Sequence, residues 1–493
     1  MDLEQEIDLL IKFNDINPKD MIKEDWLDDF NSFYNLMKEN YPYFQVKERM
    51  LGYNWLDLKD NYLKRLEEAK DVKEYLSIFY DAVVALQDSH TSIQLSLDYF
   101  YQNESFKQLY LPKFATIRKI FSDKLQETDE YWKPIMQEYY TERNHLDYET
   151  LILYSKGKYL LLAGVGNWEE KYGFGSVITA VNSTPIDETI KGTYEKDYLY
   201  WDTKRKKPYQ LYIDPKMFGQ DAKFTLKTRK GEIKEVTFDT STEYNLPSIS
   251  NYPSEIFTTK IWARQKIAYI RFGNFEPENY DKETTEYLYA FFKKVRDFNH
   301  LIIDIRGNSG GDPDVWVANI VAPLTKKKLV SKQYAAYRNG KYVNMFRKDW
   351  KRENEISKDV INSSLSAVLS DDYTVYDLSI LAEPLGEINF KAKISVLVDH
   401  KTYSAATSFT LFCKDTSFAK VYGTPNKGEG VCSGPTFYVL PNSKIVIRFF
   451  SALGFDSKGN ACEEVKVQPD IYYESELRDF DELLYFVFGD LQK

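Results

Sequence analysis

The stretch Leu301–Gly311, LIIDIRGNSGG, decides the fold of this chain. It begins as an apolar run with the length of a buried strand and ends in a turn rich in glycine. Glycines directly after a buried strand let backbone N–H groups face an approaching ligand, and such donors can stabilise an oxyanion. A tight structural turn would use the same residues, so the stretch alone leaves both interpretations open.

Strands and helices alternate on both sides of this stretch. Lys266–Phe272 has the pattern of a strand and Glu286–Phe298 that of an amphipathic helix. Further along the chain, the buried strand candidate Lys393–Val398 leads into a helical segment, Ser404–Cys413. The alternation predicts an α/β domain with βαβ units over residues 257–493.

The rest of the chain divides into two further predicted domains and one insertion. Residues 1–155 are predicted to be mainly helical, with apolar residues at helical spacing in Trp26–Met37 and Val72–Leu86. Residues 156–242 are rich in glycine and in short alternating runs, which predicts a separate β-rich module. Residues 335–390 are a polar, mixed insertion in the C-terminal domain.

Composition limits the classes of function. The chain has 493 residues, 43% of them apolar, and a net charge of −10, so about three globular domains are expected. No basic stripe interleaved with aromatic residues is present, so nucleic acid is not an expected partner. No run of about 20 apolar residues occurs, and no membrane span is expected. The oligomeric state stays open.

The first residues also bear on localisation. MDLEQEIDLLIKFNDINPKD lacks the basic start and the unbroken apolar core of a secretory signal. We expect a cytoplasmic protein, or an exported one whose signal has been removed. The cysteines Cys413, Cys432 and Cys462 are too few and too irregular for a disulfide framework or a zinc ribbon, and are expected to be buried as small apolar residues.

Histidine is scarce, which narrows the candidate chemistry. Of the four histidines, His90 lies in Asp88–Thr91 (DSHT), after a predicted helix, where a capping or surface role would also be ordinary. The metal-binding motifs HExxH and CxxC and the calcium loop are absent, as are the P-loop and the GxSxG elbow. The sequence therefore predicts no metal ion and no cofactor.

Ser404 follows a buried strand and begins a helical segment. This position exposes a hydroxyl, and the start of a helix favours developing negative charge. An ordinary helix-capping serine would occupy the same place. Ser404 alone therefore does not establish a nucleophile.

Four motifs together favour the interpretation of Ser404 as a nucleophile over that of a helix cap. They occur in this order: Leu86–Thr91 (LQDSHT), similar to L-x-D-G-H-T; Leu301–Gly311, similar to LIIDLRGNPGG; Val396–Ala406 (VLVDHKTYSAA), similar to VLVN-x-x-T-x-SA; and Glu463–Ile471 (EEVKVQPDI), similar to E-G-x-G-V-x-PDI. Together they resemble the tail-specific, or C-terminal processing, serine proteases, a family that includes the tricorn core protease and interphotoreceptor retinoid-binding protein. Gly175–Asn182 (GSVITAVN) also resembles part of the family's PDZ-like module.

The resemblance implies a fold and a choice of catalytic design. The implied fold is a multidomain α/β (α+β) protein with an N-terminal helical domain, a PDZ-like module and a crotonase-like ββα/βαβ catalytic domain. One branch of the family uses a lysine as general base, but the matching position in Gly423–Gly430 (GTPNKGEG) is Glu429, and Lys427 lies two residues earlier. The tricorn-like branch instead uses a Ser-His-Ser-Glu set.

The residues that match the tricorn-like design are Ser404, His90, Ser89 and Glu463. The resemblance implies Ser404 as nucleophile, His90 as general base and then acid, and Glu463 as the group that orients them through Ser89. Backbone N–H groups of Ala405 and of Gly310 or Gly311 would stabilise the oxyanion. Glu464 stands where the family has glycine, so Glu463 and Glu464 remain alternatives.

Two functions follow from the resemblance. The first is a serine endopeptidase that cleaves proteins or peptides near their C-terminal tails by acyl-enzyme chemistry, with the PDZ-like module capturing the tail. The alternative is a catalytically inactive binding protein on the same fold, for a small apolar ligand or a peptide tail. Retention of all four site residues favours the enzyme.

Overall fold

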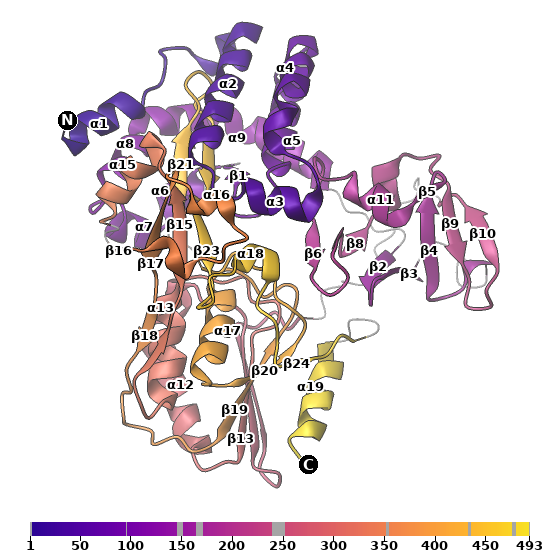
Figure 1. Cartoon of the computed structure of the whole chain (residues 1–493), viewed down its shortest axis with the longest axis vertical. Helices are drawn as coiled ribbons and strands as arrows, with labels where there is room; N and C mark the ends of the chain where they lie inside the picture. The colour runs from indigo at the N-terminus through magenta and orange to yellow at the C-terminus, as the bar shows by residue number, and fades with distance from the viewer. Residues whose placement is uncertain are drawn as a thin grey trace.

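The glycine-rich stretch lies at the end of a central strand in the computed structural model, which describes residues 2–94, 96–144, 151–163, 171–238, 252–351, 354–431, 435–475 and 480–492. This strand, β13 (His300–Asp304), belongs to a six-stranded sheet of order β11-β12-β13-β19-β20-β24 (Figure 1). The other strands of the sheet are β11 (Phe257–Trp262), β12 (Ile267–Phe272), β19 (Lys393–Val398), β20 (Lys420–Gly423) and β24 (Ile471–Tyr472). β11 is antiparallel to β12, and all other neighbours are parallel.

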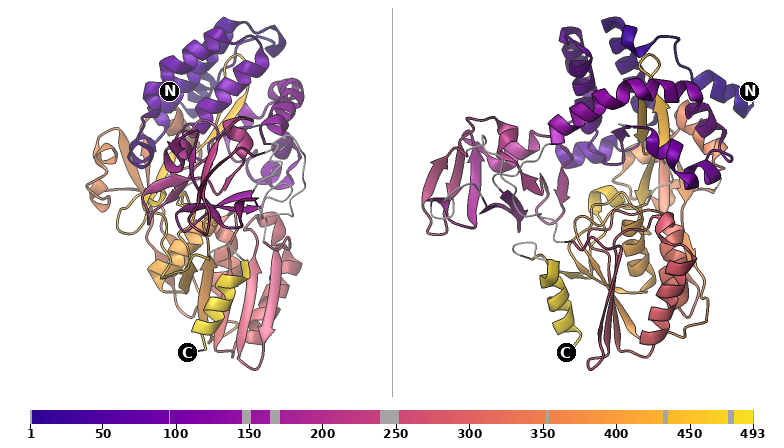
Figure 2. Two further views of the ribbon diagram at one scale, coloured as in Figure 1. Left: turned by 90° about the vertical axis from the view of Figure 1, so that its right-hand side faces the viewer. Right: turned by 180° about the vertical axis from the view of Figure 1, so that it is seen from behind.

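Both faces of this sheet are covered by helices (Figures 1 and 2). Alternate strand residues such as Ile303 and Val396 pack under α12 (Lys282–Val295), α13 (Pro313–Trp316) and α17 (Ala405–Thr416). Their neighbours, such as Ile302 and Leu397, face α19 (Phe480–Asp490) on the other side. Because successive strand residues point to opposite faces, apolar residues on both faces explain the unbroken apolar runs in the sequence. The predicted α/β class is confirmed.

The predicted helix over Glu286–Phe298 begins earlier in the structure. α12 begins at Lys282, because the Asp281 side chain accepts a hydrogen bond from the N–H of Thr284 at 2.8 Å and caps the helix. The capping side chain precedes the amphipathic pattern, so the apolar periodicity alone placed the start too late.

The N-terminal part is helical, as predicted, and its helices share a core with distant strands. Trp26–Met37 lies within α2 and Val72–Leu86 covers α5. The helices of this part are α1 (Leu3–Leu10), α2 (Lys23–Asn40), α3 (Phe44–Leu51), α4 (Lys59–Glu68), α5 (Val72–Val84), α6 (Asp98–Gln102), α7 (Glu104–Leu109), α8 (Ala115–Ile120) and α9 (Asp123–Asn144), with 3₁₀ turns at Pro18–Asp20 and Trp55–Leu58. Buried residues of these helices, such as Phe33 and Phe79, form one cluster with residues beyond 330, such as Val375 and Ile447.

Residues 335–390 build part of that shared core. They contribute to a four-stranded sheet of order β16-β17-β15-β23 and to a helix, α15, that packs against α1 and α2 (Figure 1). The elements of this region are β14 (Leu329–Ser331), β15 (Tyr334–Arg338), α15 (Lys341–Asp349), β16 (Glu355–Ile356), α16 (Ser366–Leu369), β17 (Tyr373–Asp377), β18 (Ile380–Ala382) and β23 (Ala452–Phe455), with a 3₁₀ turn at Lys358–Val360. The polar insertion is therefore the support on which the N-terminal helices dock.

One short strand joins the first hundred residues to the last hundred. β1 (Ser92–Ile93) pairs antiparallel with β22 (Val446–Phe449), which also pairs with β21 (Thr436–Val439). β1 begins at Ser92, two positions after His90. The pairing therefore fixes the position of that histidine against the C-terminal part of the chain. The remaining short elements there are a π-helical turn at Val317–Val321, α14 (Ala322–Leu324) and α18 (Cys462–Val465).

A β-rich arm projects from the side of the molecule (Figure 1). Its sheet has the order β10-β9-β4-β3-β2-β8, with β5 paired to β4. The elements are β2 (Leu151–Ser155), β3 (Lys158–Ala163), β4 (Ser176–Val181), β5 (Thr184–Pro185), α11 (Ile186–Lys191), β6 (Tyr200–Asp202), β7 (Lys207–Tyr209), β8 (Tyr212–Ile213), β9 (Phe224–Lys227) and β10 (Ile233–Val236), with a 3₁₀ turn at Pro215–Phe218. The predicted hairpin is β9 and β10, and the sheet begins at β2, a few residues before the predicted boundary.

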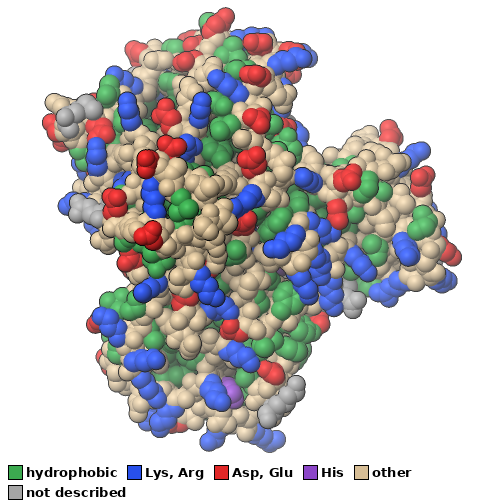
Figure 3. Space-filling model, in the orientation of Figure 1, with side chains coloured by type: hydrophobic (Ala, Val, Ile, Leu, Met, Phe, Trp, Pro, Cys, Tyr) green, Lys and Arg blue, Asp and Glu red, His purple; other side chains and the backbone are tan. Residues whose placement is uncertain are grey.

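The surface of one face is charged where the arm joins the body. Lysine and arginine side chains gather there (Figure 3). Of the helices described, none has both the length and the apolar composition that crossing a bilayer requires. Cys413 and Cys462 are buried and unpaired, as predicted, whereas Cys432 lies outside the described residues.

We predict that Gly423→Ala destabilises the six-stranded sheet. Gly423 ends β20 with a φ of +132°, and a Cβ atom there would lie 1.9 Å from the carbonyl oxygen of Val398 on β19. Gly386→Ala is the matched control, because Gly386 also has a positive φ of +74° but no heavy atom within 4 Å of the added Cβ. Both variants add backbone strain, and only Gly423→Ala adds steric overlap, so its free energy of unfolding should fall by about 1–3 kcal/mol more.

Urea denaturation followed by circular dichroism measures this difference. Equal shifts for the two alanine variants would show that the approach of β19 to Gly423 does not constrain the sheet.

Candidate active site

Two loops of the predicted site meet at one edge of the six-stranded sheet. They follow β13 and β19, which are parallel neighbours, so both leave the sheet at its carboxyl edge. Two hydrogen bonds join them: the N–H of Gly307 donates to Asp399 Oδ1 at 3.0 Å, and the N–H of Tyr403 donates to the carbonyl oxygen of Asn308 at 3.0 Å. The glycine-rich stretch and the Ser404 motif therefore form one unit.

Ser404 stands at the sharp turn between this loop and α17. Its φ of 52° and ψ of −126° are a conformation that costs a non-glycine residue about 1–3 kcal/mol. Its side chain makes no capping hydrogen bond to α17. An ordinary helix cap would accept a hydrogen bond from the first turn, so the capping interpretation does not explain this serine.

The glycines of the first loop lie directly against Ser404. A Cβ atom on Gly310 would lie 2.6 Å from Ser404 Cβ and 2.9 Å from the nitrogen of Ala405. The N–H of Gly310 donates to Asn308 Oδ1 at 2.8 Å, so it is already used. Within the described part of the chain, no acceptor takes the N–H of Ala405 or of Gly311. These two donors flank the contact between Gly310 and Ser404 in the chain, one following each residue.

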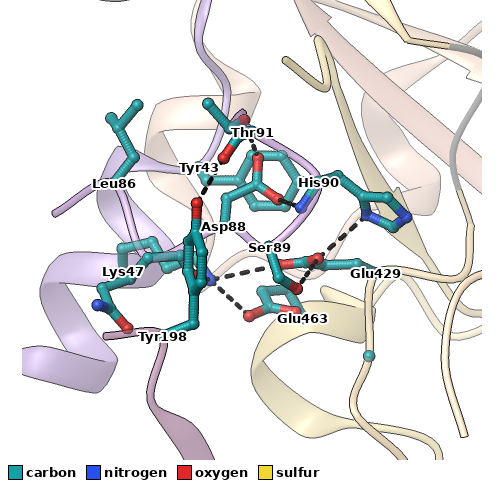
Figure 4. A network of polar contacts seen from close by, with 12 residues as sticks. Tyr43, Lys47, Leu86, Asp88, Ser89, His90, Thr91, Tyr198, Glu429 and Glu463 are labelled. Carbon is teal, nitrogen blue, oxygen red and sulfur yellow. Dashed lines mark hydrogen bonds and ion pairs between the residues drawn. The ribbon is translucent and has the colours of Figure 1, made fainter. Parts of the chain in front are cut away.

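His90 reaches this edge from the N-terminal part of the chain. Its ring stacks on that of Tyr403, with centroids 4.4 Å apart and planes inclined by 22°, and also contacts Phe450. Because Tyr403 precedes Ser404 in the chain, the stacking brings the imidazole to the turn that carries Ser404, but in the described residues no hydrogen bond joins His90 to the Ser404 hydroxyl. Figure 4 shows His90 Nδ1 directed towards Glu429.

The contacts of His90 indicate which nitrogen carries its proton. Nδ1 lies 3.1 Å from Glu429 Oε2 and 2.6 Å from the hydroxyl oxygen of Tyr403. A carboxylate can only accept, so Nδ1 carries the proton and Nε2 keeps its lone pair. Burial lowers the pKa of His90 to about 4, and the ring is neutral at neutral pH. A neutral imidazole with a free Nε2 lone pair is the form that a general base requires.

Tyr403 is the centre of a small hydrogen-bond network. Its hydroxyl group donates to Glu429 Oε2 and accepts from Ser89 Oγ at 2.8 Å. Ser89 Oγ also lies 3.4 Å from Glu429 Oε2. Glu429 therefore interacts with His90, Ser89 and Tyr403 at once. In the described residues, no hydrogen bond joins Ser89 to Glu463, the carboxylate that the resemblance assigned to it.

Glu463 instead belongs to a buried group of charges. Lys47 Nζ lies 2.6 Å from Glu463 Oε1 and 3.6 Å from Glu429 Oε1 (Figure 4). Lys466 Nζ lies 2.8 Å from Glu463 Oε2. The Lys466 contact is an ion pair without hydrogen-bond alignment. Each of these four side chains is at least nine-tenths buried. Glu463 therefore reaches His90 only indirectly, through Lys47 and Glu429.

These charges set the protonation of Glu429. Burial by itself would raise the pKa of the Glu429 carboxyl, but the hydrogen bond from His90 and the positive charge of Lys47 hold it well below its usual range. Burial likewise opposes the charge on Lys47, but the carboxylates of Glu463 and Glu429 outweigh it and raise the pKa of Lys47. Glu429 is thus ionised and Lys47 protonated over the ordinary pH range.

The structure distinguishes Glu463 from Glu464. Glu463 is 4% exposed and faces the site. Glu464 forms an ion pair with Arg49 near the surface, with 31% of its side chain exposed. Of the two alternatives, Glu463 is the one that lies in the buried network.

Asp88, His90 and Glu429 are the described residues that come closest to a metal site. Their potential ligand atoms lie within 4.8 Å of one another. Each group already has protein partners: Asp88 accepts from Thr91 Oγ1 at 2.5 Å and from the N–H of His90 at 3.0 Å. Burial and the nearby Glu429 raise the pKa of Asp88 to about 8. The arrangement is satisfied by hydrogen bonds and needs no cation to explain it.

A small cleft opens beside the network. Its walls include Ser89, Glu429 and Glu463 on one side, and the segment Tyr198–Trp201 from the β-rich arm on the other. Gln87 holds that segment, because its side-chain amide donates to the carbonyl oxygens of Tyr194 and Asp197 and accepts from the N–H of Leu199. The arm therefore forms part of the wall of the site.

Lys427, the alternative base, also lines this cleft. Its ammonium lies 4.7 Å from the centroid of the Tyr403 ring and 5.4 Å from that of Tyr200. The backbone N–H of Lys427 donates to the carbonyl oxygen of Thr402 at 2.9 Å. Lys427 is thus close to the nucleophile turn, but Glu429 occupies the position next to His90.

Comparison with known proteins identifies a family for part of the chain. Residues 266–473, which contain both loops, Ser404, Glu429 and Glu463, match the family model described as Peptidase family S41. The chain carries a Peptidase family S41 domain. It is therefore a serine-type peptidase domain, as predicted, and peptides or proteins are its class of substrate.

Solved structures are similar in fold to nearly the whole chain. Mature CPAF complexed with lactacystin superimposes with a TM-score of 0.54 at 13% identity, covering 95% of this chain and 98% of that one. Mature CPAF in another crystal structure gives 0.54 at 13% identity and covers 95% and 96%. A putative peptidase from Parabacteroides merdae ATCC 43184 gives 0.47 at 15% identity, covering 94% and 96%. No curated protein matches the sequence.

The structure adds residues to the site that the sequence did not identify. Glu429 was interpreted only as the loss of a lysine, although its place between two glycines in GTPNKGEG was visible. Tyr403 and Lys47 carried no signal, since one is the variable position of its motif and the other lies in an amphipathic helix. The roles of Glu463 and Ser89 stay predictions.

We predict that Glu429→Gln changes the state of His90 and that Glu463→Gln does not. Each substitution is nearly isosteric and removes one carboxylate from the same buried network, but only Glu429 contacts Nδ1. NMR of protein labelled with ¹⁵N-histidine reports the tautomer, and the four histidines keep the spectrum simple. Loss of the Nδ1–H signal in Glu463→Gln alone would instead identify Glu463 as the orienting group.

Proposed function

We propose that this chain is a serine endopeptidase in which Ser404 is the nucleophile and His90 is the general base. The observation that carries the proposal is the neutral His90 ring, stacked on the residue before Ser404 and bonded through Nδ1–H to an ionised Glu429. A serine hydroxyl is a weak nucleophile until a base takes its proton. The free Nε2 lone pair of His90 is the base that this geometry supplies.

The reaction would proceed through an acyl-enzyme. Ser404 Oγ attacks the scissile carbonyl carbon while His90 Nε2 takes its proton, and the imidazolium then protonates the leaving amine. Water, deprotonated by the same nitrogen, releases the acyl group in the second half. Glu429 stabilises the imidazolium and fixes its tautomer in both halves, with the Tyr403 hydroxyl holding the carboxylate in place.

The oxyanion would be stabilised by backbone donors. The N–H groups of Ala405 and Gly311 have no protein acceptor within the described residues, whereas that of Gly310 is taken by Asn308. Ala405 stands at the first turn of α17, whose dipole adds to the stabilisation of negative charge. We therefore assign the oxyanion hole to Ala405 and Gly311.

Glu463 and Ser89 would act as positioning residues. Glu463 holds Lys47, and Lys47 holds the outer oxygen of Glu429. Ser89 donates to Tyr403, which leaves the tyrosine proton for Glu429. Cleavage near C-terminal tails, with capture of the tail by the β-rich arm, is proposed from the family resemblance and from the part of that arm in the wall of the cleft. No comparison favours the inactive binding protein.

Ser404→Ala should abolish hydrolysis while leaving the fold intact, since the side chain makes no capping bond. The measurement is cleavage of an unstructured casein substrate, together with stoichiometric labelling by a fluorophosphonate probe. We expect labelling on Ser404 in the wild type and none in the variant, with a loss of about 10⁴-fold or more in kcat. Cleavage equal to that of the wild type would remove Ser404 from the mechanism.

The pH profile separates the two candidate bases. Burial lowers the pKa of His90 to about 4, and only the neutral ring can accept the serine proton. As pH falls through about 4, His90 becomes protonated, so kcat/KM should be half-maximal near that pH and level from about pH 5.5 to 7.5. A lysine base would instead make kcat/KM rise through neutral or alkaline pH. Circular dichroism at each pH controls for acid unfolding.

A further inference from the structure

The charges that line the cleft do not balance. Three lysines, Lys47, Lys427 and Lys466, face two glutamates, Glu429 and Glu463. Lys47 and Lys466 are paired with those glutamates, at 2.6 Å and 2.8 Å from Glu463. Three positive charges and two negative charges leave one positive charge without a carboxylate partner in the cleft, and that charge is on Lys427.

Lys427 has no carboxylate of its own. Among the described residues, no aspartate or glutamate lies within ion-pair distance of its ammonium, and its neighbours are the faces of Tyr403 and Tyr200. Aromatic faces attract a cation but do not accept hydrogen bonds as a carboxylate does. Burial lowers the pKa of Lys427, and the more distant carboxylates of Glu429, Glu463 and Asp197 offset this effect only in part. An anion beside it would supply the missing partner.

The backbone keeps Lys427 beside the turn that carries Ser404. The N–H of Lys427 is bonded to Thr402, and Tyr403 forms a parallel bridge with Gly428. Lys427 is thus carried on a strand-like segment alongside the turn that ends at Ser404. Lysine and arginine side chains that gather where the arm joins the body would draw an anionic chain towards this region (Figure 3).

We propose that Lys427 forms a subsite that binds a carboxylate of the substrate close to the scissile bond. This inference rests on the proposed peptidase function and names its substrate class: peptides with an acidic side chain near the cleavage site, or with a free C-terminal carboxylate there. Both sources present the same chemistry to the ammonium. The subsite would explain why a lysine is kept in the cleft although Glu429 pairs with His90 in the position next to it.

A set of matched peptides tests the subsite. The peptides are ten residues long, acetylated and amidated, with one glutamate or one glutamine placed at successive positions; a further pair differs only in a free or amidated C-terminus. For the wild type, we expect kcat/KM to be about tenfold higher for the carboxylate member of at least one pair. In Lys427→Met that ratio should fall to about 1. Lys294→Met, which removes an exposed lysine from α12, should keep it.

The pairs also identify the source of the carboxylate. A preference within the glutamate and glutamine pairs that depends on Lys427 assigns the subsite to an acidic side chain. A preference confined to the C-terminal pair assigns it to the chain end. The proposal is overturned if the ratio is near 1 in the wild type throughout, or if Lys427→Met keeps it. It is also overturned if Lys427→Met is as inactive as Ser404→Ala on every peptide, because Lys427 would then be the base.

Binding to the Ser404→Ala protein separates this inference from the proposed function. Fluorescence polarisation of the same peptides, labelled with fluorescein, measures affinity without turnover. If the wild type cleaves no peptide, the proposed function fails, but a carboxylate preference that Lys427→Met removes in the Ser404→Ala background still supports the subsite. Equal affinities for the members of every pair would overturn the subsite even if the peptidase is active.

Discussion

The site depends on the neutralisation of two buried glutamates by two buried lysines. Glu429 and Glu463 come from the C-terminal domain, and Lys47 comes from α3 in the N-terminal helices. A buried charge left without its partner costs about 3–5 kcal/mol. Separating the N-terminal helices from the C-terminal domain would leave buried charges without partners, so the ion pairs hold the two parts together. The same contact places Gln87 and His90 over the edge of the sheet, because Lys47 also donates to the carbonyl oxygen of Gln87.

This constraint explains how one carboxylate can serve both the fold and the chemistry. One oxygen of Glu429 faces Lys47, while the other accepts from His90 and Tyr403. The lysine keeps the carboxylate ionised, and the ionised carboxylate keeps the proton on Nδ1. A lysine base at the position of Glu429 would face Lys47 as a like charge and would leave Glu463 to balance three cations, because Lys466 is also paired with it. The buried charges therefore favour a histidine-centred design over a lysine-centred one.

The β-rich arm also contributes to the site, because it forms part of the wall of the cleft. Its segment Tyr198–Trp201 closes one side of the cleft. Gln87, from the motif that carries His90, accepts a hydrogen bond from Leu199 of that segment and donates to the carbonyl oxygens of Tyr194 and Asp197 just before it. The hydroxyl of Tyr198 also donates to the carbonyl oxygen of Thr91 at 2.7 Å. The residues that position the base are thus the residues that hold the arm, and a substrate in the cleft would contact both.

The sequence by itself determined the central sheet and the nucleophile turn. Apolar runs such as Leu301–Ile303, followed by a glycine-rich turn, indicate strands covered on both faces, and glycines such as Gly310 mark the place where Ser404 packs too closely for a side chain. The strands are local features, so periodicity was enough to predict them, whereas the role expected of Ser404 rested on the resemblance of four motifs to a known family. Only the tertiary structure decided which groups surround His90. Lys47 and Glu429 are separated by several hundred residues, and their contact exists only because helices and strands from opposite ends of the chain share one core. Burial in that core sets the protonation of each partner, and burial depends on the whole fold.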